Sequence, residues 1–250
     1  MLATYSRSML SVISPRTFSE VERTPTCTPG AAVPELSRGS LHIWKADLER
    51  VEDELDECLC EQEQTRARLL AGARHQTLWR RSRSLLRTLL GSYLGQPPAE
   101  LEFASGLHGK PSLQTGGEEL QFNLSHSRQF ALVAICHEGE VGVDVEVVRE
   151  PTVEVVRLAE RAFGRPEAER LQRLDRGSHS HEFMRKWTRR EAELKCRGIG
   201  LGGPVEMQIG EPWVHELTLG PGLAGAVACD RPIGQLHYLE WPPSGTRTLS

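Results

Sequence analysis

The chain has 250 residues, 26% of them charged and 38% hydrophobic, which is enough for one large domain or two small ones with a real core. Its formal net charge of −4 argues against a protein coated in basic surface for binding nucleic acid. No apolar run approaches the length needed to cross a bilayer, so we expect a soluble protein without a membrane partner.

The six cysteines are typical of free thiols. They show no paired zinc-type spacing, and the C-x-C formed by Cys58 and Cys60 has no partner pair downstream. A chain of this size without an apolar secretory segment favours reduced cysteines and a cytoplasmic location.

Residues 1–39 predict a disordered N-terminal extension, because they are rich in Ser, Thr, Pro and Arg and show no sustained period. Their opening, MLATYSRSMLSVISPR, contains basic and hydroxyl residues and no acid, as an organelle transit peptide does. A flexible tail is the simpler interpretation, and we expect no chemistry from it.

The next segment, residues 41–98, predicts a strand followed by helices. Leu41–Leu48 has a strand pattern, and Leu48–Leu59 repeats apolar residues at helical spacing between acids. Arg66–Arg87 then holds seven arginines and no carboxylate on a helical apolar pattern, which Gly95–Pro98 ends. This basic helix is either a solvated face or a site for phosphates or an acidic partner.

The middle of the chain predicts strands. The segment FNLSHS would be a loop end that leads into a strand at Phe130–Cys136. The short turn Glu138-Gly139 would join that strand to Val141–Val147 as a hairpin.

The last part predicts helices and then strands again, so the order strand, helices, strands occurs twice. The expected helices and strands cover residues 153–163, 166–174, 181–196, 206–209, 224–229 and 236–239. We therefore expect an α+β fold of two similar halves related by a pseudo-twofold axis, with residues 40–138 as the N-terminal half and 139–250 as the C-terminal half.

The strand VGVDVE carries two acids on one face. Alternation places its three valines on one side and Gly142, Asp144 and Glu146 on the other. Carboxylates are costly to bury unpaired, but two of them two residues apart on a strand can reach the same hard cation, such as Mg²⁺. An edge strand with a solvated face, or pairing with arginine, is the alternative.

A later helix offers a third carboxylate. In FMRKWTRREAELKCRGIGL, Phe183, Trp187, Glu191 and Lys195 follow one another at i+4 spacing and lie along nearly one face. Glu191 would be a third metal ligand or a general base, and Lys195 a point charge on a phosphate. The alternative is a surface salt bridge between these two residues, worth a few tenths of a kcal/mol by the order-of-magnitude rule.

Two shorter motifs supply further polar groups. His126, in the SHS sequence, would form a nucleophile–base pair with a serine, but no G-x-S-x-G elbow accompanies it, and a hydrogen-bonded loop histidine is the alternative. In HGKPSL, Gly109 permits close backbone approach and Lys110 offers an ammonium group. Neither motif is specific by itself.

Taken in series, the motifs resemble those of a known family. LEFASGLHGKPSL, FNLSHS, VGVDVE and F-x-R-x-W-T-x-x-E-A-x-x-K-x-x-G-x-G-L occur in an order and at separations similar to those of the 4′-phosphopantetheinyl transferase superfamily. The resemblance is to the larger, single-chain type that acts on carrier domains of polyketide and nonribosomal peptide synthases. It spans about residues 41–201 and implies an active site between the two halves of one chain, which would form in a monomer.

The resemblance implies roles residue by residue. Asp144, Glu146 and Glu191 match the family's magnesium-binding acids. The residues that match its coenzyme A contacts are Arg74, Lys110, Ser125, His126 and Lys195, with Arg74 placed by its spacing to the LLR of residues 85–87. Two departures stand out: Arg190 occupies a position where many members have lysine, and Arg74-His75-Gln76 lacks the usual Asp-Arg pair.

The implied reaction is Mg²⁺-dependent transfer of 4′-phosphopantetheine from coenzyme A to a serine of an apo acyl or peptidyl carrier protein, with release of adenosine 3′,5′-bisphosphate. Glu191 would be the base, directly or through a water, while Lys195 and His126 stabilise charge. Two alternatives stay open: a non-catalytic module that binds coenzyme A or a carrier, and a Mg²⁺-dependent phosphodiesterase or nuclease that uses water.

Overall fold

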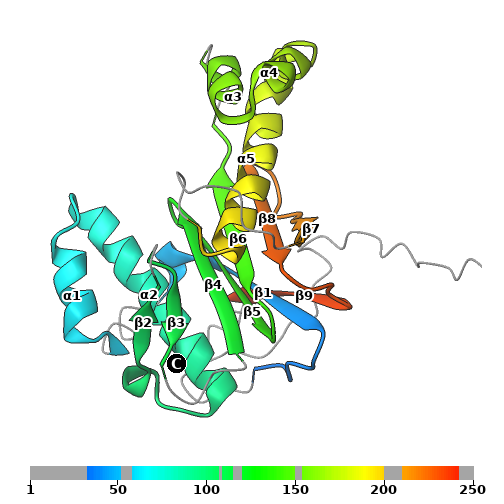
Figure 1. Cartoon of the computed structure of the whole chain (residues 1–250). Coiled ribbons are helices and arrows are strands. Elements are labelled where there is room, and N and C mark those ends of the chain that lie inside the picture. The colour runs from blue at the N-terminus through cyan, green and yellow to red at the C-terminus, as the bar shows by residue number, and fades with distance from the viewer. Residues whose placement is uncertain are drawn as a thin grey trace, which may run out of the picture.

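The computed structural model describes residues 33–51, 58–106, 109–114, 120–149, 154–199 and 210–241. Across these ranges the chain forms a four-stranded sheet, a three-stranded sheet, a two-stranded ribbon and five α-helices, which confirms the predicted α+β class (Figure 1). In the same ranges, no helix combines the length and apolar character that crossing a bilayer requires. The five cysteines found there carry free thiols.

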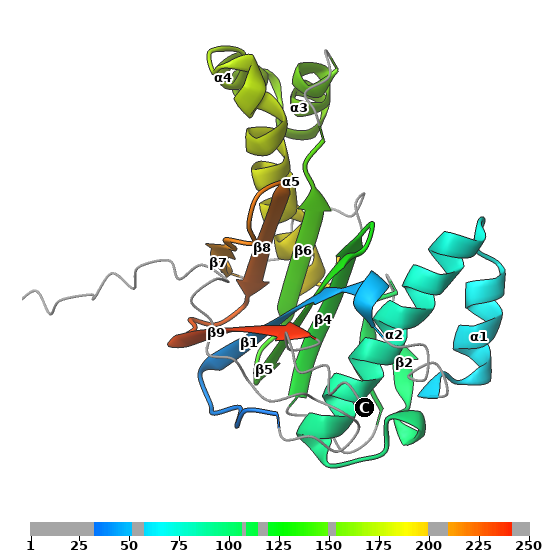
Figure 2. The same ribbon diagram turned by 180° about the vertical axis from the view of Figure 1, so that it is seen from behind.

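The first sheet has the strand order β4-β5-β1-β9. Its strands are β1 (Ser40–Asp47), β4 (Leu120–Ser127), β5 (Phe130–His137) and β9 (Gln235–Trp241). β5 pairs antiparallel with both β1 and β4, and β9 pairs parallel with β1. The last described strand therefore returns to the sheet that the first one began (Figure 2).

Two helices accompany the first sheet: α1 (Glu61–Arg68) and α2 (Ala73–Leu94). Leu85, Leu86, Leu89 and Leu90 of α2 are fully buried against Trp44 and other residues of the sheet. The prediction of a single basic helix from residue 66 was wrong. The first helix ends at Arg68 and the second begins at Ala73, after Gly72, whose φ of 86° suits glycine. Three short 3₁₀ turns cover Leu48–Arg50, Pro98–Glu100 and Arg176–Ser178.

Two arginines of α2 form ion pairs inside the fold. Arg87 Nε lies 2.7 Å from Glu63 Oε2, and Arg83 Nη2 lies 2.9 Å from Glu63 Oε1. The Arg87 side chain is only 2% exposed. These two arginines therefore tie α2 to α1 and are not available to a phosphate or an acidic partner.

The second sheet has the order β6-β8-β7, with antiparallel pairing throughout. Its strands are β6 (Val141–Val147), β7 (Trp213–Glu216) and β8 (Leu223–Cys229). The valines of β6 pack with Leu41, Ile43 and Leu132 of the first sheet, so the main core between the sheets is apolar. The other face of the second sheet is covered by α5 (His179–Cys196), whose Ala192 and Cys196 contact β8.

The predicted hairpin between residues 130–136 and 141–147 was wrong. Glu138 and Gly139 do form a turn with positive φ, but both edges of β5 are already taken by β1 and β4, so the chain passes to the other sheet. The FNLSHS segment, expected to be a loop end, forms most of β4 and makes the hairpin with β5 instead.

Smaller elements complete the described chain. β2 (Phe103–Ser105) and β3 (Pro111–Leu113) form the two-stranded ribbon, and α3 (Val155–Phe163) and α4 (Arg165–Gln172) pack on the N-terminal part of α5 (Figure 1). Phe183 and Trp187 stack there with ring centroids 6.0 Å apart. Residues 1–32, 52–57 and the strand expected at 206–209 lie outside the described residues, whereas Leu36 is buried in the core.

Candidate active site

Gly142 sets the distance between β6 and α5. A Cβ atom at this position would lie 2.1 Å from the Ala192 carbonyl oxygen and 2.2 Å from the Cys196 nitrogen, which are both backbone atoms. Only glycine lets the helix backbone approach the strand so closely. The close approach brings the acid face of β6 against α5.

Asp144 lies at the centre of this contact. Its side chain is 6% exposed, and Oδ1 accepts from Lys195 Nζ at 2.6 Å and from Ser125 Oγ at 2.8 Å. Lys195 also donates to Ser125 Oγ at 3.0 Å and to the Val143 carbonyl oxygen at 3.2 Å. The other carboxylate oxygen, Oδ2, is buried without a hydrogen-bond partner. One oxygen of Asp144 is thus neutralised, and the second remains available to a cation.

Glu146 and Glu191 extend the negative charge on either side. Ser127 Oγ donates to Glu146 Oε2 at 2.7 Å, while Glu191 Oε1 is buried without a partner. Burial, reinforced by the charge of Asp144, raises the pKa of the Glu191 carboxyl. Burial also raises the pKa of Glu146, although the Ser127 hydroxyl opposes that shift. The three carboxylates therefore interact through space and would be stabilised by additional positive charge.

These residues suit a hard divalent cation in their chemistry. In the described part of the chain, no three acidic, histidine or cysteine side chains are grouped closely enough to hold a metal as they stand. The ammonium of Lys195 is the cation beside Asp144 in this arrangement. The two buried carboxylate oxygens without partners, Asp144 Oδ2 and Glu191 Oε1, are nevertheless donors of the kind that Mg²⁺ prefers. The assignment of Asp144, Glu146 and Glu191 as ligands remains a proposal.

His126 lies near the end of β4, within reach of the charges on both Lys195 and α2. Burial first, and then the neighbouring His75 and Lys195, lower the pKa of its imidazole, so the ring is neutral at pH 7. His75 belongs to the first turn of α2, next to Arg74. Arg74 itself is 63% exposed and lies 2.7 Å from Glu49 Oε1, outside the acid cluster.

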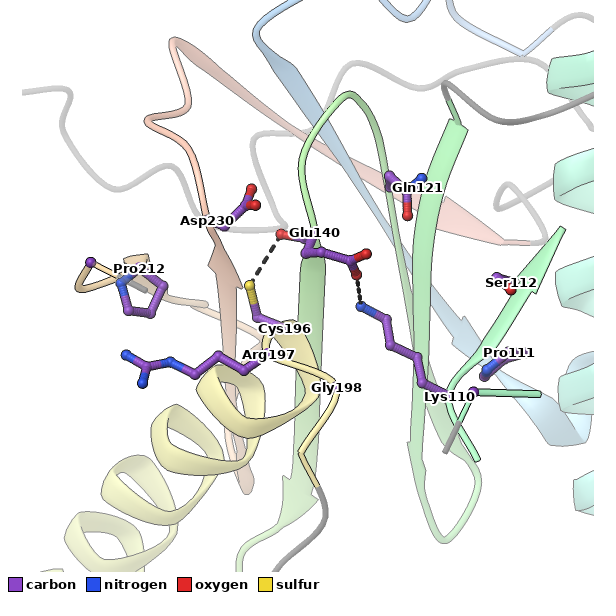
Figure 3. A pocket seen from close by; sticks show the side chains of 12 residues that line it. Lys110, Pro111, Ser112, Gln121, Glu140, Cys196, Arg197, Gly198, Pro212 and Asp230 are labelled. Atoms are coloured by element: carbon purple, nitrogen blue, oxygen red, sulfur yellow. Dashed lines mark hydrogen bonds and ion pairs between the residues drawn. The ribbon is translucent and has the colours of Figure 1, made fainter. Parts of the chain in front are cut away.

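Lys110 lies at the other end of β6. Its Nζ atom donates to Glu140 Oε2 (Figure 3). The same atom donates to the Val141 carbonyl oxygen at 2.9 Å. It lines a pocket of about 280 Å³ together with Cys196 and Gly198 at the end of α5. Asp144, Glu146 and Glu191 do not line this pocket, so the structure brings Lys110 to the neighbourhood of the acids but not into contact with them.

Sequence reasoning gave no role to Asn123 and Ser127, which contact β6 directly. The signal was present, because Asn123, Ser125 and Ser127 alternate with period two, as side chains on one face of a strand do. Treating this segment as a loop end concealed the pattern.

Residues 140–224 match the model of the 4′-phosphopantetheinyl transferase superfamily, a range that includes Asp144, Glu146, Glu191 and Lys195. The chain is 35% identical over 179 residues to the 4′-phosphopantetheinyl transferase HetI of Nostoc sp., an alignment that covers 70% of this chain and 75% of HetI. The chain belongs to the 4′-phosphopantetheinyl transferase superfamily.

Two further relatives agree with this membership. Identity is 34% over 128 residues to the putative 4′-phosphopantetheinyl transferase slr0495 of Synechocystis sp., covering 51% of this chain and 52% of the relative. It is 38% over 112 residues to the 4′-phosphopantetheinyl transferase AcpT of Salmonella typhimurium, covering 45% and 56%. The family expected from the motifs is thus confirmed, and the protein is an enzyme, a phosphopantetheinyl transferase.

Proposed function

We propose that this transferase moves the 4′-phosphopantetheine group from coenzyme A to a serine of an apo acyl or peptidyl carrier protein, of the kind found in polyketide and nonribosomal peptide synthases. Adenosine 3′,5′-bisphosphate would leave, and the reaction would take place in the cytoplasm. The main support is the convergence of Asp144 from β6 with Glu191 and Lys195 from α5, which gathers both signs of charge in one buried place.

Mg²⁺ would be held by Asp144, Glu146 and Glu191. When bound, it supplies positive charge that neutralises the pyrophosphate oxygens of coenzyme A and the charge that develops on the leaving oxygen. The raised pKa values of Glu146 and Glu191 fit this assignment. Burial and the negative charge of Asp144 disfavour the ionised form of both carboxyl groups, and a bound cation would stabilise that form.

Glu191 is the proposed general base. The carrier serine oxygen forms a bond to the phosphorus that bears pantetheine, and the bond from that phosphorus to the bridging oxygen breaks with its electron pair. The serine proton passes to Glu191, directly or through a water. A carboxylate whose pKa is raised by burial accepts a proton more readily than an exposed one, which favours this role.

Lys195 and His126 would stabilise the phosphate charge in different ways. Lys195 supplies a point charge beside Asp144. His126, whose pKa is lowered by burial and by neighbouring positive groups, enters as a neutral ring and would donate an N–H bond. A phosphate beside it would favour its protonated form.

The remaining coenzyme A contacts would come from Arg74, Lys110 and Ser125. Arg74 could exchange Glu49 for a phosphate at little cost, because an exposed ion pair is worth about 1 kcal/mol or less. Ser125 of β4 comes from the N-terminal half proposed from the sequence, and it contacts Asp144 of β6 in the C-terminal half. This contact supports an active site between the two halves of a monomer. The proposal includes a pseudo-twofold relation between those halves.

A mass-shift assay tests this proposal. Several apo carrier proteins from different pathways would be mixed with coenzyme A, Mg²⁺ and the protein at stoichiometric concentration, and the carrier mass recorded. We expect a gain of one phosphopantetheine group, lost in Asp144→Ala while the circular dichroism spectrum is kept. Absence of any gain would reject the proposal, and an active Asp144→Ala would reject the metal assignment.

A further inference from the structure

Two sheet edges meet at the acid site without forming a common sheet. β4 is the edge strand of the first sheet and β6 is the edge strand of the second, and they lie side by side in both views (Figures 1 and 2). An edge strand presents backbone N–H groups that must find acceptors when buried. The question is what accepts them on the free edge of β6.

Side chains of β4 supply the acceptors. The contacts are Asn123 Oδ1 with Val143 N at 2.9 Å, Ser125 Oγ with Val145 N at 3.4 Å, and Ser127 Oγ with Val147 N at 3.2 Å. Each pair is separated by 20 residues in sequence, so the two strands run in the same direction in one fixed register. We call Asn123, Ser125 and Ser127 the polar ladder.

The same hydroxyl groups hold the carboxylates. Ser125 Oγ accepts from Val145 N and donates to Asp144 Oδ1 at 2.8 Å. Ser127 Oγ accepts from Val147 N and donates to Glu146 Oε2 at 2.7 Å. A hydroxyl can accept one bond and donate another, which neither alanine nor valine can do. Each serine therefore fixes the backbone of β6 and the carboxylate that precedes the bonded amide.

We infer that Asn123 and Ser127 are positioning residues of this transferase, which with Ser125 lock β6 against β4 and hold the two β6 carboxylates in place beside α5. The use of those carboxylates rests on the proposed function, whereas the ladder itself does not. Groups that orient the ligands of a metal affect its affinity about 10- to 100-fold when removed. Ser127, which contacts a carboxylate, should therefore matter more for Mg²⁺ than Asn123, which contacts only backbone.

The test compares Ser127→Ala, Ser127→Thr and Asn123→Ala with Ser82→Ala. Ser82 is a buried control, whose hydroxyl donates to the Trp79 carbonyl oxygen at 2.7 Å within α2. Amide hydrogen exchange of β6 would be followed by NMR on the full chain. The Mg²⁺ concentration for half of the maximal rise in melting temperature would be measured in parallel, together with the transfer rate at saturating Mg²⁺.

We expect Ser127→Ala to expose the Val147 amide to exchange and to raise the half-effective Mg²⁺ concentration about tenfold. Ser127→Thr should restore both values, because it keeps the hydroxyl. Asn123→Ala should expose the Val143 amide with a smaller change in Mg²⁺ response. Ser82→Ala should leave both β6 amides protected and the Mg²⁺ response unchanged.

Wild-type exchange at Val143 and Val147 in both alanine variants would overturn the ladder, as would a Mg²⁺ response of Ser127→Ala equal to that of Ser82→Ala. If Ser127→Ala does not fold, Asn123→Ala and Ser127→Thr decide the question by exchange at their own amides. If the exchange results hold but no carrier is modified, the ladder stands and the proposed function falls.

Discussion

The two faces of β6 show how one strand can serve stability and chemistry separately. The valine face is fully buried against the first sheet, where any apolar side chain of similar volume would serve. The opposite face has a glycine in backbone contact with α5 and two carboxylates, one buried and one half-buried. The first face contributes to folding through apolar burial, while the second opposes it at Glu146, where burial raises the pKa of the carboxyl group. Changes on the two faces should therefore separate stability from activity.

The largest effect is expected from Glu191→Gln, which faces the acid side of β6. Removing a general base typically costs about 100- to 10,000-fold in rate. Stability at neutral pH should not fall, because burial and Asp144 already raise the pKa of this carboxyl and disfavour its charge. Single-turnover transfer and thermal unfolding would be measured together. A rate within a few-fold of wild type would remove Glu191 from the base role.

Gly142→Ala and Val143→Ala compare the two faces directly. At Gly142 a methyl group would meet the backbone of α5, so we expect a loss of about 1–3 kcal/mol in unfolding free energy together with loss of transfer. At Val143 the deletion leaves a cavity in the apolar core, costing about 2 kcal/mol, with the rate retained. Urea unfolding and single-turnover assays give both numbers. Equal rate losses in the two variants would contradict the separation of the faces.

The pH dependence of stability should differ between wild type and Glu146→Gln. The pKa of Glu146 in the folded state is raised, chiefly by burial, so its contribution is fully present below the unfolded value near 4.5 and is lost as pH rises through the folded value. In the absence of Mg²⁺, wild type and Glu146→Gln should have similar unfolding free energies near pH 4. As the pH rises to 7, the unfolding free energy of the variant should increase relative to that of wild type.

Added Mg²⁺ should reverse that difference at pH 7, because it binds the ionised carboxylate. Chemical denaturation from pH 4 to 8, with and without Mg²⁺, measures the effect. If, without Mg²⁺, the variant loses stability relative to wild type as the pH rises, the fold favours the Glu146 carboxylate and does not oppose it.

The smallest effect is expected at Arg74, an exposed residue in the first turn of α2. Its exposed pair with Glu49 is worth about 1 kcal/mol at most, so Arg74→Ala should leave the melting temperature nearly unchanged. If Arg74 contacts coenzyme A, KM for coenzyme A should rise about tenfold, in line with the loss of one charge-assisted hydrogen bond. Glu49→Ala is the matched control and should not raise KM.

The elements that the sequence predicted well are those with a strong local period. β1 was expected at 41–48 and lies at 40–47, and α5 was expected at 181–196 and lies at 179–196. Strand pairing was not predictable in the same way. Both edges of β5 are occupied by strands that precede it, β4 directly before it and β1 far earlier in the chain, so β6 cannot pair with it. Gly72 and the polar alternation of β4 were visible in the sequence. Neither the helix end before Gly72 nor the contact of the β4 side chains with β6 could be inferred from them without the neighbouring elements.

In the candidate site too, local spacing was predictable from the sequence and long-range contacts were not. Spacing of two on a strand and four on a helix was enough to place Asp144 with Glu146, and Glu191 with Lys195, on shared faces. That the two faces meet depends on Gly142 and the α5 backbone, which only the structure shows. The Arg74 pair with Glu49 and the Lys110 contact with Glu140 depend on acids distant in sequence, which no local pattern indicates.

Counting both products of one reaction tests the central claim most directly. Holo carrier protein and adenosine 3′,5′-bisphosphate would be quantified from the same mixture, with and without carrier, for wild type and Asp144→Ala. We predict equal amounts of the two products with wild type, neither product without carrier, and neither with the variant. Release of the bisphosphate from coenzyme A without carrier, or no product in any mixture, would contradict it.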